Sequence, residues 1–230
     1  RLGSMEEARE KAKDLEEKIR KETPSEISRA ASSALSLYYI AFNLNNIEGY
    51  SMENLEKVAV ESDIGGIRTA AADALESIYP NYYSASELKD LINNSPHESV
   101  KRGAAGALAI RYYSQMSPNP DLAELKKIAS DETKNRWIRE AAGRAFGELA
   151  ADEMNSVALE DLVMSGKTEE IRFGAARAWS RKLIHSEKSQ QDLLRMVCAA
   201  TGFAPPAYRT AVTSALASRM FESGPSVKGG

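Results

Sequence analysis

A phrase of nine residues recurs six times along the 230-residue chain and restricts it to a repeat architecture. The copies are ISRAASSAL from Ile27, IRTAAADAL from Ile67, VKRGAAGAL from Val100, IREAAGRAF from Ile138, IRFGAARAW from Ile171 and YRTAVTSAL from Tyr208. Successive copies begin 40, 33, 38, 33 and 37 residues apart. A period of this length is typical of a helical hairpin that is stacked in an array.

The phrase has the residue pattern of a helix that packs on more than one side. Positions 1, 5, 8 and 9 share a face at 3.6 residues per turn, and position 8 is always Ala. Position 4 is always Ala or Gly. Small residues at positions 4, 5 and 8 let a second helix approach closely, while Leu, Phe or Trp at position 9 fills the space beside them.

A second, shorter amphipathic segment lies between successive phrases. Its apolar residues are Leu55 and Val58; Leu88, Leu91 and Ile92; Leu122, Leu125 and Ile128; Leu159, Leu162 and Val163; Leu193, Leu194 and Val197. Capping boxes are predicted at Thr23 to Glu26, Ser84 to Glu87 and Ser95 to Glu98. No segment alternates like a strand, so the fold class predicted is all-α, an α-α superhelix of helical hairpins.

The array is expected to occupy residues 5–222 as a single solenoid of about five to six hairpins. A charged N-terminal helix over residues 5–21 is predicted to cap it. Residues 1–4, RLGS, are interpreted as a remnant of an expression tag, and residues 223–230 as a disordered tail.

Composition narrows the function classes. The formal net charge is −3 and the sequence pI about 5.6, which disfavours broad phosphate binding and so nucleic acid as the partner. Cys198 is the only cysteine, and His97 and His185 are the only histidines, so no disulfide, metal site or other cofactor is expected. Cys198 itself is predicted to be a small buried residue. The longest apolar stretch, residues 33–42, is too short for a bilayer. A cytoplasmic protein without membrane contact is predicted.

The phrase IRxxAAxAL, at the head of the second helix of each unit, resembles a HEAT repeat, in particular the short kind of phycobilisome-lyase-like proteins. The resemblance covers roughly residues 23 to 222. It implies a right-handed superhelix whose second helices line a concave surface that engages other macromolecules. It also implies that the basic residue at position 2 of each phrase donates hydrogen bonds to acidic residues of neighbouring repeats and so holds the repeats together. Contact with a ligand is the alternative role for this row of basic residues. That row is Arg68, Lys101, Arg139, Arg172 and Arg209, and Ser28 breaks it.

Positions 3, 7, 10 and 14 of the phrase should face away from the core. In the middle repeats they hold Arg102, Gly106, Ala109, Tyr113, Glu140, Arg144, Gly147, Phe173, Arg177 and Ser180. The candidate partner-binding strip is Arg102, Tyr113, Arg144, Phe173 and Arg177. Its arginines could bind carboxylates or phosphates through paired hydrogen bonds, while its aromatic rings supply contact area. An ordinary solvated face with salt bridges remains the alternative, since Glu140, Asp73 and Glu76 lie in or beside it.

Tyrosines follow position 9 of three consecutive phrases. Tyr79, Tyr83 and Tyr112 are candidates for an aromatic ridge at one edge of the N-terminal half, and core filling at helix ends is the competing interpretation.

The function predicted is a non-catalytic scaffold or adaptor that binds a protein or peptide partner, acidic in character, through the concave strip. A nucleic-acid-binding protein resembling the HEAT-like alkylpurine DNA glycosylases is the first alternative, but Trp179 holds core position 9 and the strip has no aspartate. An accessory lyase for a prosthetic group is the second. The di-iron deoxyhypusine hydroxylases, which also contain HEAT repeats, bind their metals with several His-Glu pairs. This sequence has the single pair His97–Glu98, so that activity is not expected.

Overall fold

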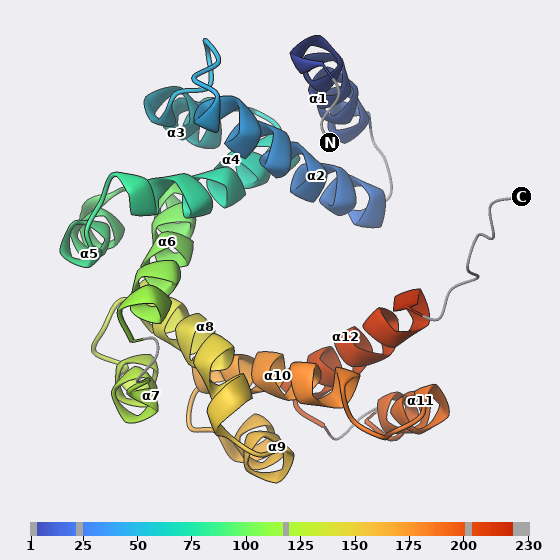
Figure 1. Ribbon diagram of the computed structural model, residues 1–230. Helices are drawn as coiled ribbons and strands as arrows, with labels where there is room; N and C mark the ends of the chain where they lie inside the picture. The colour runs from blue at the N-terminus through green and yellow to red at the C-terminus, as the bar shows by residue number, and fades with distance from the viewer. Residues whose placement is uncertain (1–3, 22–24, 117–119, 201–203, 223–230) are drawn as a thin grey trace, which may run out of the picture. The chain divides into compact units, whose positions relative to one another are not determined.

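A computed structural model of the protein describes residues 4–21, 25–116, 120–200 and 204–222. Within these ranges the chain is all-α, with no strand, and its helices pack as consecutive hairpins, an arrangement compatible with an α-α superhelix (Figure 1). The helices are α1 (Met5–Arg20), α2 (Ser25–Leu44), α3 (Met52–Glu61), α4 (Gly65–Ile78), α5 (Ala85–Asn94), α6 (Glu98–Met116), α7 (Leu122–Ser130), α8 (Arg136–Glu153), α9 (Ser156–Ser165), α10 (Glu169–Ile184), α11 (Gln190–Ala199) and α12 (Pro206–Glu222), with a 3-10 turn η1 at Tyr79–Asn81.

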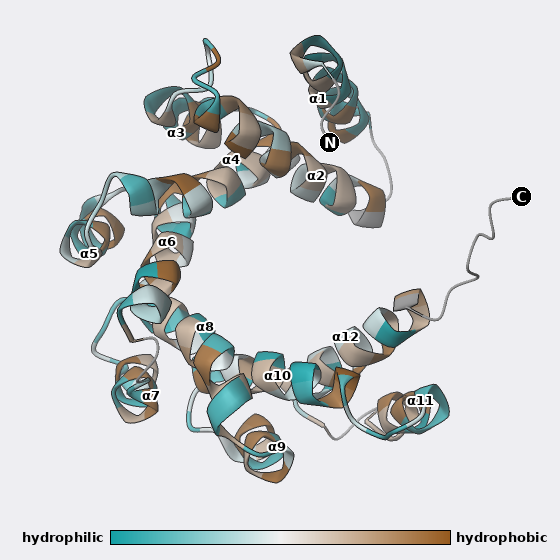
Figure 2. Ribbon diagram, viewed as in Figure 1, coloured by the Kyte–Doolittle hydropathy of each residue, from teal (hydrophilic) through white to brown (hydrophobic). Residues whose placement is uncertain are grey.

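Each copy of the phrase lies in the second helix of a hairpin, as predicted. The six even-numbered helices carry the six phrases, and the five shorter apolar segments lie in α3, α5, α7, α9 and α11. Figure 2 shows apolar and polar residues mixed on the same helices, as expected for amphipathic elements that bury one side. Two compact units are distinguished, residues 1–111 and residues 112–230, and the boundary falls inside α6.

In the first unit α1 packs on α2 and reaches the start of α4. Its buried side is Ala8, Ala12 and Ile19, and the hydroxyl of Tyr39 in α2 donates to Glu16 Oε1 at 2.9 Å. The prediction of an N-terminal helix over residues 5–21 is therefore confirmed. Ser4, interpreted from the sequence as part of a tag remnant, is the N-cap of this helix and forms a capping box with Glu7.

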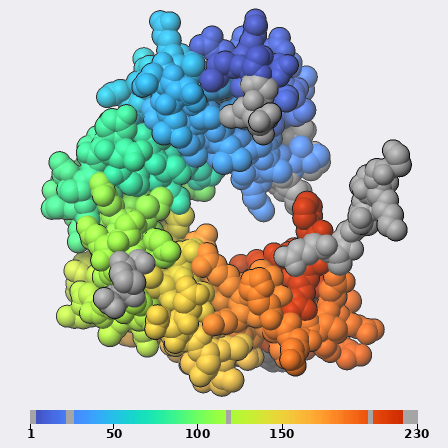
Figure 3. Space-filling model, in the orientation of Figure 1, coloured from blue at the N-terminus to red at the C-terminus, as the bar shows by residue number. Residues whose placement is uncertain are grey.

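In the second unit α8, α10 and α12 lie side by side, and α7, α9 and α11 each pack on the second helix of their own hairpin. The space-filling view shows this unit as the surface coloured from green to red (Figure 3). Its largest fully buried side chains, Trp179 and Phe146, both stand at position 9 of the phrase. Position 9 is thus core, as the pattern predicted.

Glycines set the closest helix crossing of the second unit. A Cβ on Gly143 would stand 2.5 Å from the carbonyl oxygen of Glu170, and one on Gly147 would stand 2.5 Å from the carbonyl oxygen of Gly174. A Cβ on Gly174 would meet the backbone of Gly143. The α8 and α10 backbones therefore touch, which confirms the assignment of position 4 to a helix contact and adds positions 6 and 10 to it.

The predicted helix starts have mixed outcomes. The capping box of Ser84 with Glu87 is confirmed at the start of α5, and a further box at Ser189 with Asp192 opens α11. The box predicted at Ser95 is wrong: Ser95 ends α5, and its hydroxyl accepts from the amide of His97, two residues on. The box predicted at Thr23 lies outside the described residues, as does the tail from residue 223.

Cys198 is exposed, which corrects its prediction as a buried residue. The apolar run around it is packed from one side only, because α11 buries Leu193 while Leu194 stays 51% exposed. No helix in the described part of the chain has the length and apolar character needed to cross a bilayer.

Candidate functional site

A groove with a volume of about 740 Å³ opens on the surface of the second unit. It is formed by α8, α10 and α12, with no residue from the first helices of the hairpins. Its lining is Arg136, Trp137, Glu140, Arg144, Glu169, Glu170, Phe173, Gly174, Ala176, Arg177, Ser180, Arg181, Thr210, Ala211 and Ser214.

The register of the phrase places the central side chains of this groove. Positions 3 and 7 contribute Glu140 and Arg144 from α8, Phe173 and Arg177 from α10, and Thr210 and Ser214 from α12. These positions lie one helical turn apart, so three adjacent helices present two rows of side chains to one surface. The sequence-derived strip is thereby brought together for Arg144, Phe173 and Arg177. Phe173 is 43% exposed, a large ring held at the surface.

Arg102 and Tyr113, the other members of the predicted strip, do not line this groove. Arg102 belongs to the first unit, where its Nη2 pairs with Asp73 Oδ1 at 2.9 Å. Tyr113 is exposed near the end of α6. Position 10, predicted to face outward, is instead packed in all three middle repeats, because Ala109, Gly147 and Ser180 are buried. Gly106, predicted to face outward at position 7 of α6, is also buried.

Sequence reasoning missed the first turns of α8 and α10. Arg136 and Trp137 line the groove just before the phrase, with the Arg136 guanidinium carbon 4.7 Å from the centre of the Trp137 ring. Glu169 and Glu170 precede the phrase of α10 in the same way, and Arg181 follows it. Extending the outward face by one turn on each side of the phrase would have found them.

Ion pairs fix several charges around the groove. Glu148 in α8 forms ion pairs with both Arg177 and Arg181 of α10. The distance from Arg177 Nε to Glu148 Oε1 is 3.1 Å. Arg139 Nη2 lies 2.9 Å from Glu170 Oε1, with the two side chains only 19% and 16% exposed. The single carboxylate of Glu148 is therefore shared between two guanidiniums at the wall of α10.

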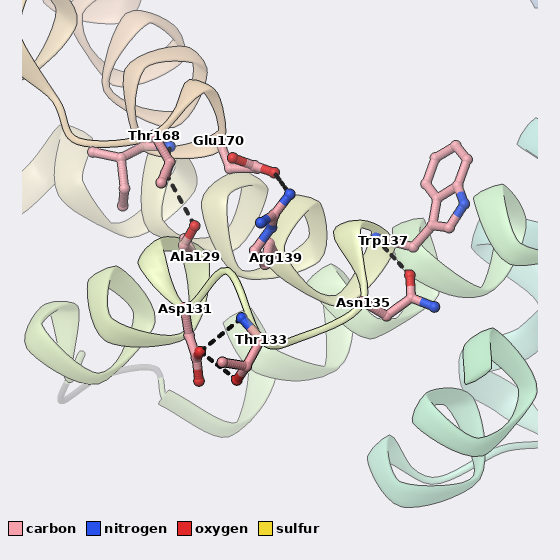
Figure 4. A network of polar contacts seen from close by, with 9 residues as sticks. Ala129, Asp131, Thr133, Asn135, Trp137, Arg139, Thr168 and Glu170 are labelled. Atoms are coloured by element: carbon pink, nitrogen blue, oxygen red, sulfur yellow. Dashed lines mark hydrogen bonds and ion pairs between the residues drawn. The ribbon is translucent and has the colours of Figure 1, made fainter.

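Hydrogen bonds support the start of α8 and α10 beneath the groove (Figure 4). The Thr168 hydroxyl donates to the carbonyl oxygen of Ala129 at 3.0 Å, which joins the start of α10 to α7 of the preceding hairpin. Asn135 caps α8 by accepting from the Trp137 amide at 3.0 Å. Hydrogen bonds from the hydroxyl and amide of Thr133 lower the pKa of Asp131 in the connecting turn.

Of the basic residues at position 2 of the phrase, Arg139 forms an ion pair with the next repeat. The row does not form a continuous ladder of such contacts. Arg68 donates to the carbonyl oxygen of Ser62 at 2.5 Å, and Lys101 pairs with Glu98 in its own helix. The aliphatic stem of Arg172 lies near Gly166, and Arg209 is exposed. The ladder expectation is therefore wrong for Arg68 and Lys101, whose partners lie within one hairpin or one helix.

Arginines at position 12 make the contacts that the second position was expected to make. Arg111 donates to the carbonyl oxygens of Pro80 and Tyr83 after α4, from Nη2 at 2.5 Å and 3.0 Å. Arg219 contacts the carbonyl oxygens of Leu183, Ile184, Ser186 and Lys188 after α10. Each arginine thus holds the loop that leaves the second helix of the preceding hairpin.

The tyrosines fill the core rather than form an exposed ridge. Tyr79 and Tyr112 are 0% and 5% exposed, and Tyr83 is partly exposed with its ring 5.4 Å from that of Tyr79. Burial, with a smaller effect of the Glu56 carboxylate, raises the pKa of Tyr79, and burial raises the pKa of Tyr112 to about 12. Of the two interpretations, core filling is the one the structure supports for Tyr79 and Tyr112.

Among the described residues, no group of three or more His, Cys, Asp or Glu side chains is placed to hold a metal ion. The acidic residues that line the groove are glutamates, so the aspartate of the glycosylase alternative is not present in its lining. Trp179, assigned to the core from the sequence, is buried and donates from Nε1 to Ser156 Oγ at 2.9 Å.

Comparison with protein-family models, curated proteins and solved structures found no match. The function of the groove must therefore be argued from its own geometry.

Proposed function

We propose that the protein is a non-catalytic adaptor built from HEAT-type repeats, and that the groove of α8, α10 and α12 binds an acidic segment of a protein partner. The observation that carries the proposal is the convergence of Arg136, Arg144, Arg177 and Arg181 beside Trp137 and Phe173. Guanidinium forks match carboxylates with two parallel hydrogen bonds, and exposed rings add contact area.

The charges of the groove favour a negatively charged ligand. Four arginines line it against three glutamates. Glu170 is bonded to Arg139, and Arg177 and Arg181 share the single carboxylate of Glu148. A volume of about 740 Å³ accommodates a few side chains of a peptide rather than a folded domain. The ligand class that fits is a short peptide with Asp or Glu side chains next to an apolar residue.

Selection from a random peptide library displayed on phage tests this proposal. The wild-type protein should enrich peptides with clustered Asp or Glu, and the selected peptides, labelled with fluorescein, supply the probe for polarisation titrations. The R144E/R177E variant should bind them roughly ten- to a hundredfold more weakly, because it replaces two attractive contacts with two repulsive ones. The neutral R144Q/R177Q variant should be intermediate.

The matched control is K127E/R195E, which makes the same charge change at residues 82% and 73% exposed in α7 and α11. It should retain wild-type affinity, and circular dichroism should show equal helicity for all variants. No enrichment of acidic peptides, or equal binding by R144E/R177E, would contradict the proposal.

Nucleic acid is the second candidate, favoured only by the pairing of Trp137 with arginines in the same groove. A single-stranded DNA oligonucleotide titrated at low and high salt distinguishes it, because phosphate contacts give a steep salt dependence. Binding of this oligonucleotide that is stronger than peptide binding, and lost in R144E/R177E, would replace the peptide proposal.

A further inference from the structure

Two opposite sides of each second helix are used to join one hairpin to the next. The side made by positions 1, 4 and 8 faces the preceding hairpin, and the side made by positions 6, 10 and 13 faces the following one. Gly174, at position 4 of α10, lies against Gly143 and Gly147, at positions 6 and 10 of α8. Gly103, at position 4 of α6, lies against Ala72, at position 6 of α4, and Tyr79, at position 13 and the first residue of η1.

Burial follows this rule along the chain. Positions 4 and 8 are buried in α4, α6, α8, α10 and α12, each of which has a preceding hairpin. Positions 6 and 13 of the first five phrases are buried, and each of these phrases is followed by a further hairpin. Within each unit the two sides therefore form one type of contact between consecutive hairpins.

The first phrase exposes the side that the other phrases bury. Ile27 at position 1 is 52% exposed, Ala30 at position 4 is exposed and Ala34 at position 8 is partly exposed. The same side of α2 continues with Leu37 and Leu44, which are 67% and 64% exposed. Apolar residues spaced alternately by three and four along an exposed helix are typical of a surface that another helix covers.

The last phrase exposes the opposite side. Thr213 at position 6 and Ala217 at position 10 of α12 are exposed, whereas Ala176 and Ser180 at the same positions of α10 are buried. Phe221, on the following turn of α12, is 92% exposed. Small residues at positions 6 and 10 are buried in α10, which packs on α12, and α12 has Thr213 and Ala217 at the same positions.

We propose that a second copy of the chain stacks head to tail on the first, with the α12 side of Thr213 and Ala217 covering the α2 side of Ile27, Ala30 and Ala34 of the next copy. The contact repeats the one made between consecutive hairpins within each unit, since it joins the same phrase positions. Because the two surfaces differ, the interface is heterologous, and repetition produces a closed ring or an open filament.

The test uses variants that block one end each. A30E places a carboxylate in the α2 side and A217E places one in the α12 side, at positions exposed in the single chain. A123E, at an exposed position of α7, is the matched control. Masses are measured by sedimentation equilibrium over a range of concentrations, and helicity by circular dichroism.

Head-to-tail stacking predicts that the wild type and A123E exceed the 25.1 kDa of the monomer as concentration rises, with no limit at the dimer for an open filament. A30E alone and A217E alone should remain monomers, and their equimolar mixture should form a 1:1 heterodimer and nothing larger. That last result follows because each variant keeps one competent end.

Two outcomes would overturn the proposal. A wild-type protein that stays monomeric at all concentrations shows that the two sides do not meet. An A217E variant that still dimerises while A30E does not shows that α2 pairs with α2 of another copy. Because the groove residues are unchanged in these variants, peptide binding by A30E and A217E reports separately on the proposed adaptor function.

Discussion

At the scale of single residues, the arginines divide into those that bond to the backbone of a neighbouring hairpin and those that line the groove. Arg111 and Arg219 are committed to backbone carbonyl groups at the ends of neighbouring hairpins. Arg144 and Arg177 stand at position 7 of their phrases and line the groove. Position within the phrase, rather than the presence of an arginine, determines which role applies.

Replacing Arg111 with Met tests the structural role. The carbonyl oxygens of Pro80 and Tyr83 would lose charged donors, so the free energy of unfolding should fall by about 1.5 to 3 kcal/mol in urea titrations followed by circular dichroism. R195M, which removes an exposed arginine paired with Asp192 in its own helix, should change stability by less than about 0.5 kcal/mol. Equal stability of the two variants would show that the Arg111 contacts contribute nothing.

At the scale of elements, the crossing of α8 and α10 depends on glycines. Glycine in the interior of a helix normally costs stability relative to alanine, so Gly to Ala substitutions tend to stabilise helices. At Gly174 the expected sign is reversed, because the added Cβ meets the backbone of Gly143 and lies 3.3 Å from Phe146 Cδ1.

The G174A variant should therefore lose about 1 to 3 kcal/mol of unfolding free energy, and G174L more, because the helices must separate. G65A is the control, since a Cβ there meets only Arg68 Nη2 at an ordinary 3.7 Å. Thermal melts of both variants decide the question. A G174A variant as stable as G65A would show that α8 and α10 can move apart at no cost.

The phrase predicted the helices, their pairing and the core positions because small residues at fixed spacing permit few packings. It located Arg144, Phe173 and Arg177 of the groove, since outward positions follow from the 3.6-residue period. Arg136 and Trp137 were missed because they precede the phrase. Ser95 and Cys198 were misplaced for local reasons: a serine near a helix start can end the previous helix, and an apolar run can be packed on one side only.

At the scale of the whole molecule, each compact unit contains buried phenols whose ionisation is suppressed. In the first unit, burial is the largest cause of the raised pKa of Tyr39 and Tyr79, with the neighbouring carboxylates Glu16 and Glu56 adding to it. In the second unit, burial raises the pKa of Tyr112 to about 12. Ionisation of these groups is linked to unfolding, because an unfolded tyrosine has a pKa of about 10.

This linkage predicts loss of the fold in alkali. Below pH 10 both states keep the phenol protons, so tyrosines give no pH dependence; above it the unfolded chain releases protons that the folded chain retains, and stability falls. Each fully protected tyrosine removes about 1.4 kcal/mol per pH unit in that range. Urea titrations from pH 8 to 11 should show a shallower fall for Y39F/Y79F than for Y82F, whose ring is already 59% exposed. Equal slopes would mean that buried tyrosines do not control alkaline unfolding.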